Sequence, residues 1–449
     1  MSIRKYLKEC QEVYHTTLDP NGPGAIRIHL VPPRRLKPGI PWVVIINGYS
    51  ILPLQTSWAI LLKEFIVALN ESKGESLDEE DINSLVGHVI KRVKDIYKDA
   101  KDEDIKEDLN SIIDVLLAIS KNEEPKLKIG LLSLGEYAKD LRAPHRMDLM
   151  ISSMTKNKCW HCNQKCLLCY AGDERLANVE ELSTEEWLKI IDIMKESYIP
   201  ELTFTGGEPT LREDLPILVE HAKWFVTRLN TNGIRLTKDL CKRLYEASLD
   251  SVQVTLYSYD EAIHNKMVGG NHFRETIAGI KNALEAGLDV SINTPLCNLN
   301  KDYLHTVMFA HKLGIRYFSS SGVIPTGYAL EKNEGVEALS KEEILACIKE
   351  AYSYTSVNNL ELAFTSPGWI DSKELDLMHM VTPSCGACLS NMAIAPNGEV
   401  IPCQSWLFED GLGNILTTKF KRIWSSKKCK KRRAYSAKSL EKCALREVR

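Results

Sequence analysis

The feature that most constrains the fold is a regular alternation of strand-like and helical segments between about residues 145 and 325. The helical segments include 183–197, where Ser183 and Glu186 form a capping box, and 273–287. Strands that alternate with helices are joined by crossovers and run parallel. Six repeats predict an α/β fold, a partial (β/α)6 TIM-like barrel with its functional loops at the C-terminal ends of the strands. The strand-like segments are 148–154, 201–207, 224–232, 250–257, 288–296 and 314–322.

Two further segments flank this barrel. The one before it opens with strand-like runs at 25–31 and 42–48 and continues with helical stretches, which predicts a small α+β module, with a winged helix as one form. The one after it begins with a helix at 341–355 and then becomes rich in loops and cysteines. The predicted domains are therefore 1–144, 145–329 and 330–449.

The composition of the chain limits the cellular compartment and the classes of partner that we expect. The chain has 449 residues, a net charge of −3 and 13 cysteines, an odd number that falls largely in clusters. Its first 17 residues lack the apolar core of a signal peptide, and no apolar run is long enough to span a bilayer. We therefore expect a cytoplasmic protein with neither nucleic acid nor membrane as a partner, in which clustered cysteines bind metal before they form disulfides.

The first cysteine group lies directly after the first predicted barrel strand. Its spacing, Cys162-x3-Cys166-x2-Cys169, suits a [4Fe–4S] cluster held by three thiolates with one iron left open. Cys159-x2-Cys162 with Cys166-x2-Cys169 equally fits a zinc knuckle, so the spacing alone leaves both interpretations open. After the second strand comes Thr205-Gly206-Gly207-Glu208-Pro209, where two glycines let the backbone approach a ligand.

The cluster loop and the Gly-Gly-Glu-Pro motif, in this order and on these strands, resemble the radical S-adenosylmethionine (radical SAM) superfamily over about residues 150–325. The resemblance implies reductive cleavage of S-adenosylmethionine to a 5′-deoxyadenosyl radical that abstracts hydrogen from a substrate. It also implies a reducing partner such as flavodoxin or ferredoxin. By this resemblance Cys162, Cys166 and Cys169 hold the cluster, and S-adenosylmethionine is contacted by Gly206, Gly207, Glu208, Asn232 and Thr255.

Three residues around these motifs depart from the family pattern or have an ordinary explanation. Leu168 stands where the family usually has an aromatic residue, so that Tyr170 is an alternative source of adenine stacking. Asn232, in Thr231-Asn232-Gly233, equally fits a plain β-to-α turn. Cys159 falls outside the motif and is expected to be a buried thiol.

The second cysteine group begins with Cys385-x2-Cys388 and continues through a predicted hairpin that returns the chain to Cys403. Cys388-x9-Gly398-x4-Cys403 resembles the SPASM/twitch extension of many radical SAM enzymes. The resemblance implies one auxiliary [4Fe–4S] cluster held by Cys385, Cys388 and Cys403. Structural zinc is the alternative, and a second auxiliary cluster lacks support. For the fourth ligand the candidates are Cys443, Cys429 and the substrate itself.

The substrate is less constrained. The auxiliary extension is common on enzymes that act on peptides, and the order of elements in residues 1–144 loosely resembles the recognition element of ribosomal-peptide (RiPP) maturases. Such a module would bind a precursor peptide by adding a strand to its sheet edge. The first hypothesis is therefore a peptide maturase that forms a thioether cross-link or epimerises a residue. For epimerisation, Cys297 after the fifth strand is a candidate hydrogen donor.

Two alternatives belong to other classes. One is a radical SAM enzyme of cofactor or haem-like biosynthesis, because Cys385-x2-Cys388-x14-Cys403 also resembles the second cluster motif of the molybdenum-cofactor cyclase. That interpretation leaves residues 1–144 without a purpose. The other is a non-catalytic zinc-binding protein, which would be colourless where an iron–sulfur protein is brown.

Overall fold

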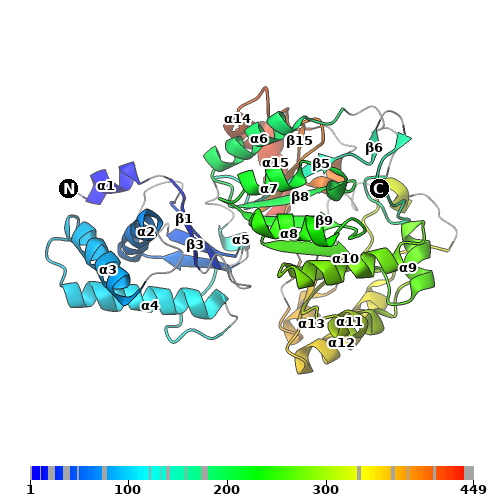
Figure 1. Ribbon diagram of the computed structural model, residues 1–449, viewed down its shortest axis with the longest axis horizontal. Helices are drawn as coiled ribbons and strands as arrows, with labels where there is room; N and C mark the ends of the chain where they lie inside the picture. The colour runs from blue at the N-terminus through cyan, green and yellow to red at the C-terminus, as the bar shows by residue number, and fades with distance from the viewer. Residues whose placement is uncertain are drawn as a thin grey trace. The chain divides into compact units, whose positions relative to one another are not determined.

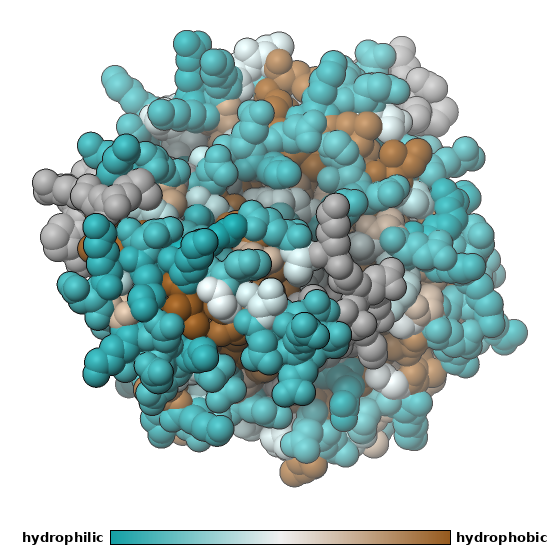
Figure 2. All heavy atoms as spheres, turned by 60° about the vertical axis from the view of Figure 1, so that its left-hand side comes forward, coloured by the Kyte–Doolittle hydropathy of each residue, from teal (hydrophilic) through white to brown (hydrophobic). Residues whose placement is uncertain are grey.

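The computed structural model divides into two compact units, Met1–Ala143 and Pro144–Arg449 (Figure 1). Among the described residues, no helix is both long and apolar enough to cross a bilayer. Figure 2 shows a face that is largely hydrophilic, with hydrophobic atoms confined to small separate areas. The structure describes residues 3–10, 12–18, 26–33, 41–47, 50–72, 78–120, 123–132, 134–137, 142–156, 159–172, 180–330, 335–365, 370–380, 382–383, 385–407 and 411–438.

The first unit is an antiparallel sheet followed by helices, as the predicted α+β module requires. The sheet has the order β1-β2-β3-β4, and every described strand pair in it is antiparallel. Helix α2 contacts β1, β2 and β3, and α3 and α4 pack on α2 (Figure 1). The elements are α1 (Ile3–Glu9), β1 (Tyr14–Leu18), β2 (Ile26–Val31), β3 (Trp42–Ile46), β4 (Ser50–Leu54), α2 (Thr56–Glu71), α3 (Glu79–Lys94), α4 (Asp102–Ser120) and α5 (Leu134–Tyr137).

Amphipathic spacing explains this packing. In α4 the buried residues Ile105, Leu109, Ile112 and Leu116 recur every three or four positions, so they form one apolar face. Helix α3 begins at a capping box in which the side chain of Asp78 accepts a hydrogen bond from the backbone N–H three residues on. These faces join the strands in one apolar core.

The second unit is built on a nine-stranded sheet, in which seven consecutive strands, β13-β12-β11-β10-β9-β8-β5, are all parallel. Six of these strands match the predicted repeats, and the α/β partial barrel is confirmed. The strands are β5 (Arg146–Ser152), β8 (Glu201–Gly206), β9 (Val226–Thr231), β10 (Ser251–Thr255), β11 (Asp289–Pro295), β12 (Tyr317–Ser321) and β13 (Glu361–Thr365).

Helices follow these strands and cover one face of the sheet; Figure 1 shows α7, α8 and α10 over it. Along β10 the buried apolar Val252 and Val254 alternate with the half-buried polar Ser251, Gln253 and Thr255. This period of two puts apolar side chains under the helices and polar ones inside the barrel. The helices are α6 (Thr184–Glu196), α7 (Leu215–His221), α8 (Lys238–Glu246), α9 (Glu261–Val268), α10 (Phe273–Glu285), α11 (Tyr303–Lys312) and α12 (Lys341–Val357).

The C-terminal segment adds to the same sheet. Strand β14 (Asn391–Ile394) pairs in parallel with β5, and β15 (Val400–Ile401) returns antiparallel to β14 as the predicted hairpin. Beyond the hairpin lie α14 (Phe420–Ser425) and α15 (Lys427–Ser436). Strands β13 and β14 both come from the predicted third segment, so the barrel and the C-terminal extension share one sheet. The predicted domain limits near residues 145 and 330 stay predictions.

Candidate functional site

The C-terminal ends of the parallel strands surround a cavity of about 390 Å³. Strands from β5 to β13 line it, together with the loop that carries the first cysteine group. The structure brings together here all eight residues that the sequence predicts for the cluster and for S-adenosylmethionine, although the role of each stays a prediction. They are Cys162, Cys166, Cys169, Gly206, Gly207, Glu208, Asn232 and Thr255.

The cysteine loop is held by backbone hydrogen bonds to the end of α9. Lys165 N donates to Val268 O (3.0 Å), and Leu167 N donates to Met267 O (2.9 Å). At its start the Trp160 indole donates to Gln164 O (2.8 Å). These bonds fix the path of the loop without using the thiols, so the cysteine side chains are left to turn toward the cavity that they line.

The three thiols lie close enough to influence one another. Burial raises the pKa of Cys162 to about 12 and that of Cys169 to about 11, and for Cys162 the neighbouring Glu208 and Cys169 add to the effect. Burial also raises the pKa of Cys166 well above its usual value, with Cys169 and Cys162 contributing. Thiolates in such surroundings need positive charge beside them, which a metal centre supplies.

This donor set fits a cluster in which each thiolate binds a different iron. Within the described residues, no group of three or more His, Cys, Asp or Glu side chains converges on a point that would hold a single metal ion. A cubane places one thiolate on each of three separate irons and so does not require convergence on one point. The side chain of Cys159 lies outside the described residues.

Gly206 and Gly207 are required by the packing of the chain itself. Gly206 has a φ of +139°, and a Cβ built there would lie 2.1 Å from Ser152 O. A Cβ on Gly207 would lie 2.5 Å from Ser153 O. The end of β8 therefore approaches the end of β5 more closely than any side chain allows, a contact that the motif alone does not reveal.

Glu208 is 1% exposed and joins the loop after β8 to the end of β9. Its carboxylate accepts hydrogen bonds from Asn232 N (2.8 Å), Thr231 Oγ1 (2.7 Å) and both Thr210 N (3.0 Å) and Thr210 Oγ1 (2.5 Å). Burial raises the pKa of this carboxyl, and the four hydrogen bonds oppose that rise. Thr210 and Thr231 are thus part of the site, and sequence reasoning missed them because isolated threonines give no motif.

Asn232 makes the contact of a plain β-to-α turn, while its role toward S-adenosylmethionine stays a prediction. Its Oδ1 accepts from Ile234 N (3.1 Å), which is the turn contact. Its Nδ2 donates to Asn163 Oδ1 (2.7 Å) in the cysteine loop, which links the third strand end to the cluster loop. The side chain therefore holds the turn and steadies the loop at the same time.

The aromatic and thiol side chains near the cysteine loop have distinct surroundings. Leu168 packs with Tyr257 and Cys297 in a buried cluster. Cys297 is 0% exposed, contacts Met267 Sδ at 3.9 Å and is not among the residues that line the cavity. Tyr170 instead reaches toward the second cysteine group, where its hydroxyl donates to Gln404 Oε1 (3.0 Å).

Deeper in the barrel the cavity wall is made of amides and hydroxyls. Gln253 Nε2 donates to Ser319 Oγ (3.3 Å), which in turn lies 3.0 Å from Asn293 Oδ1. Ion pairs lie beyond them: Arg146 Nε is 2.9 Å from Asp148 Oδ1, and Arg228 Nε is 2.8 Å from Glu201 Oε1. The two arginines that line the cavity are thus already matched by carboxylates.

The second cysteine group lies beside the hairpin. Cys385 and Cys388 are buried, and Cys388 N donates to Pro402 O (3.1 Å), which ties this loop to the residue before Cys403. The predicted return of Cys403 toward Cys388 is therefore seen in the structure. Cys443 lies outside the described residues, whereas Cys429 is buried on α15.

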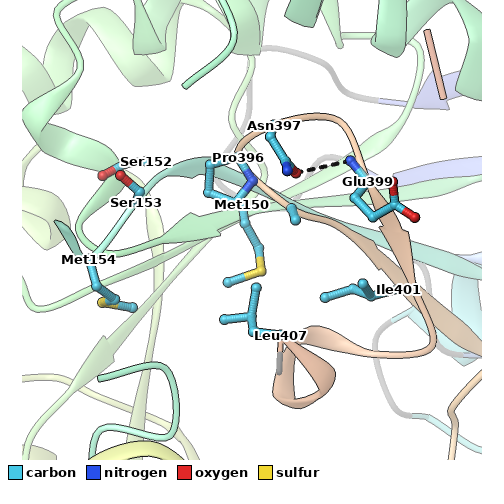
Figure 3. A pocket seen from close by; sticks show the side chains of 10 residues that line it. Met150, Ser152, Ser153, Met154, Pro396, Asn397, Glu399, Ile401 and Leu407 are labelled. Atoms are coloured by element: carbon cyan, nitrogen blue, oxygen red, sulfur yellow. Dashed lines mark hydrogen bonds between the residues drawn. The ribbon is translucent and has the colours of Figure 1, made fainter. Parts of the chain in front are cut away.

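A small cavity shows how the hairpin is seated. Figure 3 shows Met150 of β5 facing Ile401 of β15 and Leu407, with the hairpin turning above them at Asn397. The Asn397 side chain accepts from Glu399 N (3.2 Å) and closes that turn. The apolar contact holds the hairpin against the first barrel strand, and the auxiliary cysteines with it.

Comparison with known proteins shows that two family models match the parts of the chain that carry the cysteine groups. Residues 161–310 match the model of the radical SAM superfamily, and residues 385–445 match that of SPASM, an iron–sulfur cluster-binding domain. The AdoMet-dependent heme synthase of Oleidesulfovibrio alaskensis is 26% identical over 281 residues, which are 59% of this chain and 71% of that protein. The probable GTP 3′,8-cyclase of Thermococcus kodakarensis is 34% identical over 157 residues, 34% of this chain and 51% of that protein.

A solved structure resembles nearly the whole chain. Streptococcus suis SuiB bound to the precursor peptide SuiA aligns with a TM-score of 0.61 and 17% identity, covering 97% of this chain and 96% of SuiB. At this identity the likeness shows the fold. It extends over both units of the chain, because each lies within the aligned length.

Proposed function

Because this chain is a radical SAM enzyme with a SPASM iron–sulfur domain, we propose that it modifies a ribosomally made precursor peptide. The radical SAM domain takes a [4Fe–4S] cluster and S-adenosylmethionine, and the SPASM domain takes auxiliary iron–sulfur. When bound, these groups supply one electron and a radical that removes hydrogen from carbon. The modification is a thioether cross-link or an epimerisation.

The observation that carries the peptide proposal is the α+β unit that precedes the barrel. The first 143 residues form a compact unit with its own core, and SuiB, whose structure was determined with a precursor peptide, has a similar fold across both units. A separate binding unit lets an enzyme hold a peptide at one place while another part of the peptide reacts.

The edges of its sheet decide how a peptide strand can be added. On β4, Ile51 O already accepts from Leu132 N (2.9 Å), and Pro53 has no N–H to offer. On β1, His15 O accepts from the side chain of Asn70 (2.8 Å). Each edge is thus partly engaged by the chain itself.

The barrel interior favours a polar substrate. Gln253 and Asn293 carry both a donor and an acceptor, so each can hydrogen-bond a peptide group in either direction. For the chemistry, these residues would hold the reacting carbon in place.

A haem-type or other cofactor substrate is the second candidate, and the heme synthase relative over 59% of the chain is the observation in its favour. A tetrapyrrole presents a large apolar ring with several carboxylates. The cavity combines amides and hydroxyls with apolar side chains, but its Arg146 and Arg228, which could bind those carboxylates, already face Asp148 and Glu201. This chemistry favours the peptide over the tetrapyrrole.

The test is anaerobic reconstitution followed by an assay for 5′-deoxyadenosine with S-adenosylmethionine and dithionite. Synthetic copies of short open reading frames adjacent to the gene serve as peptide probes, and iron coproporphyrin III serves as the competing substrate. We expect peptide-dependent 5′-deoxyadenosine together with a peptide that has lost two hydrogen atoms or taken up solvent deuterium. Turnover of the porphyrin with none of the peptides would refute the peptide proposal.

The matched control is a chain in which Cys162, Cys166 and Cys169 are all replaced by alanine. We expect it to hold less iron and to make no 5′-deoxyadenosine, because the cluster beside S-adenosylmethionine has lost its ligands. Radical formation by this variant would contradict the assignment of the three cysteines.

A further inference from the structure

One face of α15 lies against the loop that carries the first two auxiliary cysteines. Cys429, Arg433 and Ser436 are spaced four and three residues apart, so they lie on the same side of the helix. Ser436 Oγ donates to Ala387 O (2.7 Å), and Arg433 Nε donates to Cys388 O (2.9 Å). Two hydrogen bonds therefore fasten this helix face to the loop.

Cys429 brings a further thiol into that contact. Its side chain is 0% exposed and lies close enough to the thiol of Cys388 for each to affect the pKa of the other. Arg433 Nη2 donates to the Cys429 sulfur (3.3 Å). Cys403 lies near enough to Cys388 to contribute to the raised pKa of that thiol. Cys385 Sγ lies 3.5 Å from Ser436 Oγ, which is on α15 like Cys429. The helix that carries Cys429 is thus fastened to the loop that carries Cys385 and Cys388.

We propose that Cys429 is the fourth thiolate ligand of the auxiliary cluster and that Arg433 is a positioning residue that hydrogen-bonds its sulfur. The inference rests on the proposed cluster at Cys385, Cys388 and Cys403. As the iron–sulfur bond forms, the Cys429 thiol releases its proton to solvent. The guanidinium then offsets part of the negative charge that a fourth thiolate adds, which a buried site needs.

Full thiolate ligation has a functional consequence. A cluster with four protein ligands has no open iron, so it can exchange electrons but cannot bind a substrate atom. In this chain the auxiliary cluster would then accept or donate an electron near the substrate, and the peptide thiol or amide would not be its ligand. This separates the mechanism from one in which the substrate completes the cluster.

The experiment uses the full chain with Cys162, Cys166 and Cys169 replaced by alanine, reconstituted with iron and sulfide, so that the auxiliary site is read alone. Cys429→Ala is compared with Cys443→Ala as the matched control. Iron per chain is counted, and electron paramagnetic resonance is recorded after mild oxidation with ferricyanide. A cubane in which one iron lacks a thiolate ligand loses that iron on oxidation and becomes the paramagnetic [3Fe–4S] form.

We expect the parent chain and Cys443→Ala to stay silent after oxidation, and Cys429→Ala to give the [3Fe–4S] signal or to lose the cluster. The reverse pattern would assign the fourth ligand to Cys443. A signal from the parent chain itself would mean an open iron. Either result overturns the proposal.

Two controls separate this proposal from the assumptions beneath it. If the parent chain binds no iron while the wild type still makes 5′-deoxyadenosine, the auxiliary cluster and the role of Cys429 are refuted. The radical function of the chain is then unaffected by that result. Should Cys429→Ala lose its circular dichroism spectrum, Arg433→Met provides the second measurement. We expect this variant to keep its iron and to have a more negative midpoint potential, because it loses a hydrogen bond and a positive charge beside the cluster. An unchanged potential would refute the positioning role.

Discussion

Replacing Gly206 by alanine tests whether the end of β8 needs a glycine for reasons of packing. The new Cβ would lie 2.1 Å from Ser152 O and 2.8 Å from Ser152 N, both backbone atoms of a paired strand that cannot move aside alone. The residue also has a φ of +139°, where L side chains are strained. Both effects act against the folded state.

Gly314 provides the matched control. Its φ of +103° imposes the same kind of strain, but its Cβ would meet only a leucine methyl at 3.7 Å. For Gly314→Ala we expect a loss of about 1–2 kcal/mol from backbone strain alone. Gly206→Ala adds overpacking of about 1–3 kcal/mol, for a total of about 2–5 kcal/mol. The difference between the two variants therefore measures the steric contact.

The assay is urea unfolding of both variants and the wild type, followed by circular dichroism, with S-adenosylmethionine binding measured in parallel. We expect Gly206→Ala to be the less stable variant and to bind the cofactor more weakly, because the strand end that carries Gly207 and Glu208 has to shift. Equal losses in the two variants would refute the packing argument, since strain would then explain the whole effect.

Three further changes test other parts of the barrel. Burial lowers the pKa of His264 to about 4 from its usual 6.5, so the unfolded chain binds more protons between these values. The free energy of unfolding should therefore fall by up to about 3 kcal/mol as the pH drops from about 6.5 to 4. Acid titration of His264→Asn should show a smaller fall. An identical pH profile in this variant would contradict the lowered pKa of His264. Tyr170→Phe removes the hydrogen bond to Gln404 and should cost about 0.5–1.5 kcal/mol in urea unfolding, whereas no change would show that this contact contributes nothing. Gln253→Leu removes an amide from the cavity wall and should raise the KM for the proposed peptide substrate about threefold to tenfold, and an unaltered KM would contradict its binding at this wall.

Local sequence patterns were sufficient to predict the barrel and its cofactor loop. Strand and helix periods depend on neighbouring residues, and parallel strands must end at the same edge, so the cysteine loop and Gly206-Gly207-Glu208 could be placed together in advance. The cavity lined by both motifs follows from that geometry.

Long-range contacts could not be predicted in the same way. The hydrogen bonds of Glu208 to Thr231 and Asn232 join residues more than 20 positions apart, and the sequence offered no signal that these residues pair with the Glu208 carboxylate. The approach of Cys429 to Cys388 depends on how α15 packs, which is set by side chains such as Arg433 and Ser436 on one helix face.

The sequence by itself thus determined the order of strands and helices and the position of the cysteine loop at the strand ends, because each depends on local spacing. The kind of cofactor chemistry followed from the resemblance of its motifs to a known family, since spacing alone left zinc and iron–sulfur both open. Only the tertiary structure decided that β13 and β14 extend the barrel sheet, that two glycines make room for a neighbouring strand, and that a helical cysteine meets the auxiliary loop. These features arise where segments distant in the chain pack together, and packing depends on the shapes of both partners at once.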